Sequence, residues 1–385
     1  MKKKLFALGM ATAIAITGAS PVSAADEWMQ ETEMSGLHEI ATYVIWSETY
    51  DSLNQIMNSS DICLIGTVID QSIEKRSGMY FTHSYVETED EQIYDVMQTG
   101  AVVNGKDSNI PFDAPLMEIG QDYFLCLNHA NYVSEFGQYY LIAGGNQGCG
   151  EYNETSNSVD SVNIGDRALF SSFSFASTNT DVNNITYDSV SNIQEASTRL
   201  INPLPVGNSV WDIWEGDGAT YYVTDESHPS SSSRVTAIEN GLASWNRAYT
   251  TSNNQRLTVS KASSKSRANV QVVVSDISGV DWIGQAVLYG SGKTYSVQIG
   301  TENVTYYVID SVGITITPYS LPAAPDSFWR SVAAHEMGHG VGLPHNDRSG
   351  RIMQTNHADF DAYSGPTTLD KNDLATMYDV VDSLF

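Results

Sequence analysis

Short apolar runs, separated by polar turn residues, fill the chain between residues 60 and 152. Glycine, asparagine, aspartate and proline interrupt these runs, and such residues end strands and form turns. The runs that we expect to be strands are residues 62–69, 78–86, 92–98, 123–128 and 138–143. Five short strands in so short a stretch are typical of a small barrel. Residues 60–152 are therefore predicted to form a β-barrel domain.

Residues 206–385 contain strand-like runs and also apolar residues at helical spacing. We interpret this region as a second domain. Apolar residues recur every three or four positions over residues 233–249 and predict an amphipathic helix. The stripe, which we expect in the core, consists of Ile238, Leu242, Trp245 and Tyr249. Further helices are expected from residues 326 and 368, and strands at residues 220–224, 256–260, 270–275 and 311–318. This mixture predicts an α+β fold.

Two segments flank the barrel and differ from it. Residues 25–59 are expected to form a partly helical segment. Its residues at helical spacing are Ile40, Tyr43, Val44 and Ser47. Residues 153–205 belong to a region rich in serine, threonine and asparagine, with 22 such residues between 151 and 200. That composition predicts a linker, or a loosely structured segment, between the two domains.

The N-terminus has the pattern of an export signal. Three lysines precede an apolar run over residues 5–16, and small residues at 22–24 are suited to cleavage. Residues 1–24 are therefore predicted to be a signal peptide, and the mature protein to be secreted and extracellular. No later run comes near 18 consecutive apolar residues, so we expect no membrane span.

The chain carries a formal net charge of −27, from 46 acidic and 19 basic residues. So acidic a surface repels nucleic acid and anionic membranes, and we expect no nucleic-acid partner. Some carboxylates are candidates for binding Ca²⁺, but no Asp-x-Asp-x-Asp-Gly loop marks a site. Three cysteines are too few for a disulfide scaffold. Cys63 and Cys126 lie in apolar runs and are expected to be small buried hydrophobes rather than a bridge.

The strongest chemical signal is the sequence HEMGHGVGLPH at residues 335–345. His335 and His339 stand four residues apart, so a helix places both imidazoles on one face, where they can bind one Zn²⁺. Glu336 points elsewhere and is placed to handle a metal-bound water. Gly342 can adopt a left-handed conformation that ends the helix and brings His345 round as a third ligand. Three protein ligands leave one position open, as catalytic zinc sites require.

The spacing His-Glu-x-x-His-x-x-Gly-x-x-His resembles that of the metzincin metallopeptidases. Met353 stands eight residues after His345 and resembles the methionine of the turn that lies beneath the zinc in this family. Such a short gap is similar to the matrixin-like branch. Asn346 matches none of the residues, serine, glutamate or aspartate, that branches of the family carry after the third histidine, so the subfamily stays open. Thr355 stands where astacins and serralysins have a tyrosine.

This resemblance covers residues 206–385. It implies a metzincin-type zincin catalytic domain, with a twisted mixed sheet, a zinc helix, a Met-turn and a C-terminal helix. It also implies a zinc-dependent endopeptidase that acts on a protein or peptide, with Glu336 as general base and acid. The preceding barrel resembles the OB-like β-barrel domains of secreted Gram-positive proteins, a likeness that transfers no function to individual residues.

Two other functions stay open. The chain could be a catalytically silent secreted binding protein whose barrel carries the function. It could also be a latent zymogen that everything before residue 206 inhibits. In that form a thiolate from Cys149 could fill the open metal position, although a turn cysteine without a role is the default interpretation.

The remaining candidates carry weaker signals. His357 is expected to be a loop residue rather than a fourth ligand, and Asp347 could orient a ligand imidazole. The histidines without ligand spacing, expected at the surface, are His38, His83, His129 and His228. Substrates of the resembled family lie extended along an edge strand. Residues 311–318 or 306–310 are our candidates for that edge, with an ordinary inner strand as an equal alternative.

Overall fold

The computed structural model describes most of the chain. The described residues are 36–111, 113–134, 137–162, 172–175, 185, 190–194, 208–216, 218–227, 232–299, 302–318, 321, 323–346, 349–354 and 363–385. The predicted signal peptide and the candidates Asp347, His357 and His228 lie outside them. The described part has the predicted α+β class, with more strand than helix. None of its helices is both long and apolar enough to cross a membrane.

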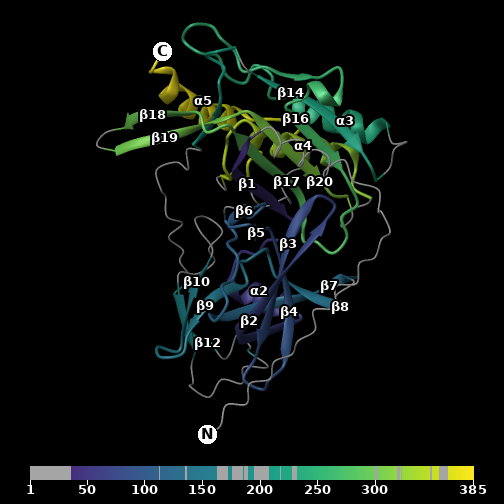
Figure 1. The fold of residues 1–385 in the computed structure, drawn as a ribbon, viewed down its shortest axis with the longest axis vertical. Helices are drawn as coiled ribbons and strands as arrows, with labels where there is room; N and C mark the ends of the chain where they lie inside the picture. The colour runs from purple at the N-terminus through teal and green to yellow at the C-terminus, as the bar shows by residue number, and fades with distance from the viewer. Residues whose placement is uncertain are drawn as a thin grey trace.

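Two stacked parts are seen in Figure 1, with the N-terminal half below and the C-terminal half above. The lower part is built around a closed ring of five strands. In order around the ring these are β2 (Ile62–Arg76), β3 (Met79–Glu87), β4 (Ile93–Thr99), β8 (Gly137–Ile142) and β7 (Asp122–Ser134). All five strands predicted in this region are therefore present: β2 and β7 are longer than predicted, and the other three are shifted by one residue. A small hairpin, β5 (Ala101–Val103) and β6 (Lys106–Ser108), follows β4.

The predicted linker contains strands that continue this sheet. β9 (Cys149–Asn153) pairs with β7, and β10 (Ser158–Ser161), β11 (Ser172–Phe175) and β12 (Val190–Gln194) follow in antiparallel order. Phe173 and Phe175 pack on Phe124 of β7, with ring centroids 5.2 and 6.1 Å away. Helix α2 (Leu53–Ser59) covers the same apolar cluster. The linker prediction was wrong for these strands because serines alternate with the two buried phenylalanines and dominate the composition.

A buried ion cluster lies in the wall of the ring and contradicts the surface position expected for His83. The His83 side chain is completely buried on β3; its Nδ1 lies 2.8 Å from Asp95 and its Nε2 3.1 Å from Glu74. Burial lowers the pKa of His83, but the hydrogen bonds to the two carboxylates outweigh it and raise that pKa to about 9. His83 also meets the ring of Tyr139 edge-on, and Tyr139 donates a hydrogen bond to the carbonyl of Gly279 in the upper part.

This cluster predicts a loss of stability at alkaline pH. Because the pKa of His83 is higher in the folded chain than its ordinary 6.5, its contribution is fully present below pH 6.5 and is lost as the pH rises through about 9. We expect the free energy of unfolding in urea to fall by up to about 3 kcal/mol over that window. The variant His83→Gln should lack this component, so an identical pH dependence in both proteins would refute the assignment.

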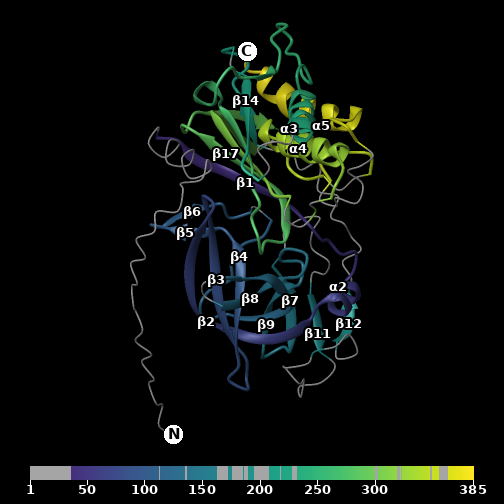
Figure 2. The ribbon, with the colours of Figure 1, turned by 90° about the vertical axis from the view of Figure 1, so that its right-hand side faces the viewer.

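The main sheet of the upper part has six strands, in the order β1-β17-β20-β16-β14-β15. The four parallel strands are β14 (Ala219–Asp225), β15 (Val259–Lys261), β16 (Val270–Val274) and β20 (Ser311–Ile316). β17 (Trp282–Gly290) runs antiparallel to β20. Helices α3 (Ser232–Ala243), α4 (Asp326–Gly340) and α5 (Thr368–Asp382) lie on one side of this sheet (Figure 2). The predicted apolar stripe is buried there, although α3 ends six residues before the predicted Tyr249 because turns follow Ala243.

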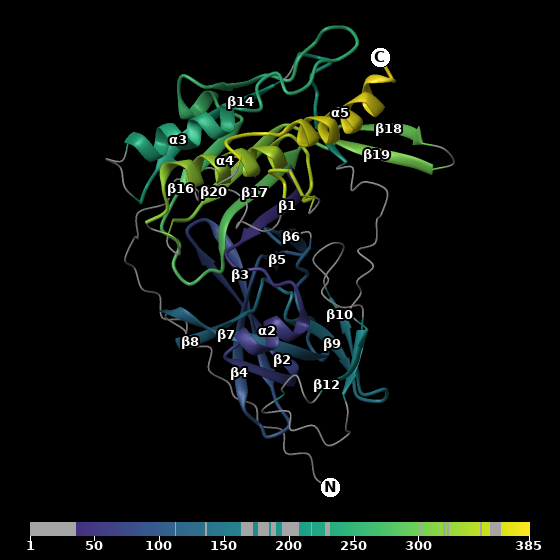
Figure 3. The ribbon, with the colours of Figure 1, turned by 180° about the vertical axis from the view of Figure 1, so that it is seen from behind.

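A smaller sheet flanks the C-terminal helix. It contains β13 (Ser209–Trp211), which is parallel to β19 (Glu302–Ile309), and β18 (Thr294–Ile299), which is antiparallel to β19. Figure 3 shows the β18–β19 hairpin beside α5. A short 3-10 helix, η3 (Lys265–Arg267), precedes β16.

The segment expected to be partly helical near the N-terminus contains one helix, α2, but its residues at helical spacing form a strand of the upper sheet. β1 (His38–Trp46) pairs antiparallel with β17 over its whole length, and Figure 2 shows it at the boundary of the two parts. Successive side chains of β1 are buried on opposite faces, as in any strand. The same apolar run also fits a helical period, so its sequence alone does not distinguish the two structures. Tertiary pairing decides the structure.

Neither candidate for the substrate edge holds that position. Residues 311–316 form β20, an inner strand between β16 and β17, as the alternative interpretation had it. Residues 306–309 belong to β19 in the smaller sheet. Without β1, the strand at this border of the main sheet would be β17. β17 is buried along its whole length and so lacks the alternating pattern that marks a strand in the sequence.

Candidate metal centre

Helix α4 presents two of the candidate histidines and ends where the sequence predicts. Gly342 has φ +99°, a conformation that favours glycine. The amide of Gly342 donates to the carbonyl of His339 at 2.7 Å, and the amide of Leu343 donates to that of Gly338 at 3.0 Å. This pair of bonds is the Schellman motif that closes a helix and reverses the chain. His345 follows on the returning segment.

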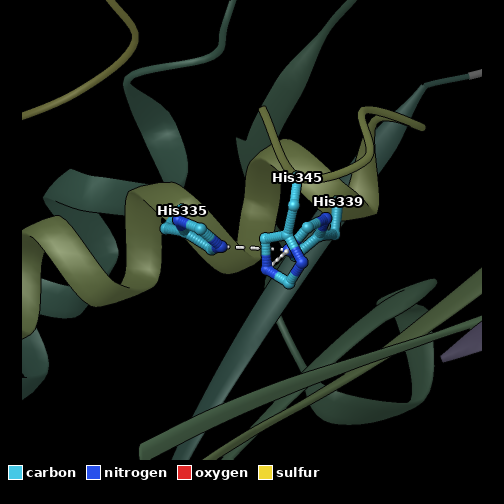
Figure 4. A group of neighbouring side chains, drawn as sticks. All are labelled: His335, His339 and His345. Atoms are coloured by element: carbon cyan, nitrogen blue, oxygen red, sulfur yellow. Dashed lines mark hydrogen bonds between the residues drawn. The ribbon is translucent and has the colours of Figure 1, made fainter. Parts of the chain in front are cut away.

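The three histidines converge on one point (Figure 4). One nitrogen from each of His335, His339 and His345 lies within 4.8 Å of the other two. The Nε2 atoms of His335 and His339 are 3.0 Å apart, and those of His339 and His345 are 3.2 Å apart. The structure thus brings together all three residues that the motif predicted as ligands.

Backbone carbonyls set the protonation of the two helical imidazoles. Nδ1 of His335 lies 2.6 Å from the carbonyl oxygen of Ile352, and Nδ1 of His339 lies 2.7 Å from that of Leu343. A carbonyl only accepts, so each Nδ1 carries the proton and each Nε2 presents a lone pair. Burial lowers the pKa of His335 to about 4. Burial, and then the repulsion that two protonated rings would have, lower the pKa of His339. Both rings are therefore neutral.

This arrangement fits a metal ion. Two neutral imidazoles with facing Nε2 lone pairs repel one another at 3.0 Å unless a cation lies between them. Imidazole nitrogens suit Zn²⁺, and hydrogen bonds from the opposite ring nitrogen are the usual support of a zinc-binding histidine. The donor set is consistent with zinc, and three protein ligands leave a position for a further one.

A turn beneath α4 supplies one of those carbonyls. Met353, fully buried, packs its thioether against Gly338, where an added Cβ would fall on the sulfur. The preceding Ile352 amide donates to the buried carboxylate of Asp370 at 3.0 Å, and Asp370 also caps the start of α5 through Thr367. Asp370 of α5 thus holds this turn in place, and the turn holds the imidazole of His335 through the Ile352 carbonyl. Asp370 was missed in the sequence, where it appears only as part of a helix start.

Glu336 has an environment unlike that of any other acid described here. It is completely buried, and neither carboxylate oxygen has a hydrogen-bond partner. The carboxylate packs against Gly284 of β17, where an added Cβ would fall on its oxygen. Burial raises the pKa of Glu336 well above its usual range. A buried acid without a partner destabilises the fold, and such groups are common at catalytic sites.

Two residues from the N-terminal half reach the histidines, and sequence reasoning missed both. The ring of Tyr43 on β1 stacks on His339, with centroids 4.3 Å apart and planes within 4°. Asp113, in the segment between β6 and β7, has a carboxylate oxygen 3.9 Å from Nδ1 of His345. No local motif marks either residue, because both arrive through contacts distant in sequence.

Cys149 is not at this centre. It begins β9 and packs inside the ring among residues such as Leu125 and Val86. Burial raises the pKa of its thiol, so the thiolate that metal binding needs is disfavoured. The cysteine-based inhibition considered from the sequence is therefore wrong in this structure. Cys63 and Cys126 are buried free thiols, as predicted.

Comparison with known proteins adds no relative: no family model matches the sequence, and no curated protein is significantly similar to it.

Proposed function

We propose that this chain is a secreted zinc-dependent endopeptidase. The observation that carries the proposal is the convergence of three imidazole Nε2 atoms, together with a buried carboxylate without a partner on the residue that follows His335. The succession of β14, α3, the strands up to β20, α4, the Met353 turn and α5 supports it, because this order is the one expected of a metzincin catalytic domain. The five-stranded ring supports the OB-like interpretation of residues 60–152. Export rests on the predicted signal peptide.

Each residue of the site has its own role in the proposed hydrolysis. His335, His339 and His345 would hold the metal, and Gly342 and Met353 support them. A Zn²⁺ ion held by these residues would supply Lewis-acid chemistry for the substrate carbonyl and the attacking water. Glu336 accepts the proton of the attacking water and delivers it to the amine nitrogen that leaves. Burial raises the pKa of Glu336, which favours its holding that proton between the two steps.

A catalytically silent binding protein explains fewer of these features. It needs neither three converging imidazoles nor a buried acid that destabilises the fold. Ca²⁺ binding stays a prediction without a site: among the residues described here, only the three histidines form a group suited to a metal ion.

Metal binding tests the proposal directly. We expect one Zn²⁺ per chain by elemental analysis, and an affinity, measured against a chelating dye, at least about 100-fold weaker in His345→Ala. His129→Ala is the matched control, because His129 is half-exposed and pairs with Asp61 away from the centre. Peptide cleavage should stop on chelation and return with Zn²⁺. Equal zinc binding by all three proteins, or cleavage that a chelator leaves unchanged, would refute the proposed function.

A further inference from the structure

β1 occupies the edge of β17. The register pairs Tyr43 with Ala286 and Ile45 with Gly284 in antiparallel order. An extended peptide that joins a sheet by its backbone adopts this kind of pairing at an exposed edge. β1 comes from the segment that leads into the lower part, and the rest of the upper sheet begins only at β14. The edge is therefore filled by a distant segment of the same chain.

The two faces of β1 have different neighbours. Tyr43 and Ile45 pack in the core of the upper part, with α4 and the main sheet. Val44 and Trp46 pack with residues of the ring, such as Phe81 and Tyr139. Trp46 lies directly against Gly145, where a Cβ would fall on the indole. β1 is thus held between the metal-bearing part and the barrel.

The inner face of β1 covers the residues assigned to chemistry. Tyr43 stacks on His339, and Ile45 pairs with Gly284, the glycine against which Glu336 packs. The barrel adds contacts at both ends: Asp113 approaches His345, and the amide of Asn109 donates to Glu39 of β1 at 3.0 Å. An incoming peptide cannot reach β17 while these contacts persist.

We propose that β1 is an intramolecular pseudosubstrate: it fills the peptide-binding edge of β17 and keeps the enzyme latent until it leaves. This inference rests on the proposed function. It also defines a substrate class, because a peptide in the place of β1 directs alternate side chains toward α4. Substrates are extended peptides with an aromatic residue and a branched apolar residue two positions apart, as Tyr43 and Ile45 are.

The test opens the chain without removing any of it. A recognition site for a specific protease is inserted between Glu48 and Thr49, just beyond β1, where Glu48 is exposed. After cutting, the opened chain is mixed with an excess of a fluorescent peptide of residues 36–48. We expect the peptide to exchange with β1 in the metal-free opened chain, as measured by anisotropy, and not in the uncut chain.

Side-chain variants of the peptide identify what the edge recognises. Tyr43→Ala in the peptide should weaken binding at least about 10-fold, because the ring on His339 is lost. Tyr43→Phe keeps the ring and should bind nearly as well. With Zn²⁺ present, the opened chain from which β1 has dissociated should cleave peptides about 100-fold faster than the uncut chain. This factor of about 100 corresponds to β1 being detached in about 1% of the uncut molecules. Excess unlabelled peptide should reverse this gain.

A variant of the uncut chain provides a second, independent readout. Tyr43→Ala should raise peptide cleavage about 10-fold by loosening β1, and Tyr43→Phe should not. If β1 is instead a permanent strand, the opened chain keeps β1 bound or unfolds, and that result overturns the inference. An absence of any gain in cleavage by Tyr43→Ala overturns it as well. Equal cleavage by uncut and opened chains overturns it too, while leaving the peptidase intact. Peptide exchange without cleavage by any form supports β1 as the occupant of the edge and refutes the peptidase.

Discussion

Replacement of Glu336 by glutamine is expected to abolish peptide cleavage while zinc binding persists. Glutamine has nearly the same shape but cannot accept and return a proton, so kcat should fall by about 10²–10⁴-fold. The three histidines keep their carbonyl partners at Ile352 and Leu343, so the affinity for Zn²⁺ should change little. The loss would then belong to proton transfer and not to the metal.

The same substitution should increase the stability of the metal-free protein, although it abolishes cleavage. The pKa of Glu336 in the folded chain lies above its ordinary 4.5, so the folded chain binds this proton more tightly than the unfolded chain. The free energy of unfolding therefore decreases as the pH rises above 4.5. Glutamine removes this penalty, and we expect Glu336→Gln to be about 1–3 kcal/mol more stable at pH 7. A group that lowers stability yet is needed for turnover is characteristic of active sites.

The measurement combines three assays on the opened chain: cleavage of a diverse peptide library read by mass spectrometry, zinc content, and urea unfolding after chelation. Glu215→Gln is the matched control, because it makes the same exchange at an exposed carboxylate of the upper part and should alter none of the three. Full cleavage by Glu336→Gln would show that Glu336 is not the general base. Loss of zinc together with cleavage would show that it supports the metal instead.

The sequence predicted the parts of the site whose geometry is local. A spacing of four on a helix fixes the relation of His335 to His339. A glycine after the last helical turn fixes the return of the chain toward His345. Strands with alternating apolar residues, and the stripe on α3, were likewise recognisable because each depends on only a few neighbouring residues.

The rest depends on pairing between distant segments. Nothing near Tyr43 in the sequence indicates that it stacks on a residue almost three hundred positions later. β1 fits a helical period as well as a strand, and only the vacant edge of β17 selects the strand. β17 is buried on both faces and shows no alternation. Asp370 looks like an ordinary helix cap, and its role follows only from the approach of the Met353 turn.

Gly342→Ala is expected to be among the most destabilising single substitutions in the upper part. A Cβ at this position would fall on the carbonyl oxygen of Ser209 in β13. β13 cannot easily give way, because it pairs with β19 and because Trp211 donates its indole N–H to the carbonyl of Gly340 at 2.7 Å. The φ of +99° adds backbone strain for any residue with a Cβ. Together these effects should cost about 2–5 kcal/mol.

The same substitution should weaken metal binding, which links the helix end to the chemistry. The turn at Gly342 places the Leu343 carbonyl on Nδ1 of His339, and a shifted turn loses that bond. The affinity for Zn²⁺ should then fall by about 10–100-fold. Gly292→Ala is the matched control: its φ is +90° but a Cβ there meets nothing within 4 Å, so backbone strain alone should cost about 1–2 kcal/mol. Urea unfolding and competition with a chelating dye measure both quantities. If the two variants behave alike, the contact with β13 does not shape the site, and the return of His345 must be held by the Met353 turn alone.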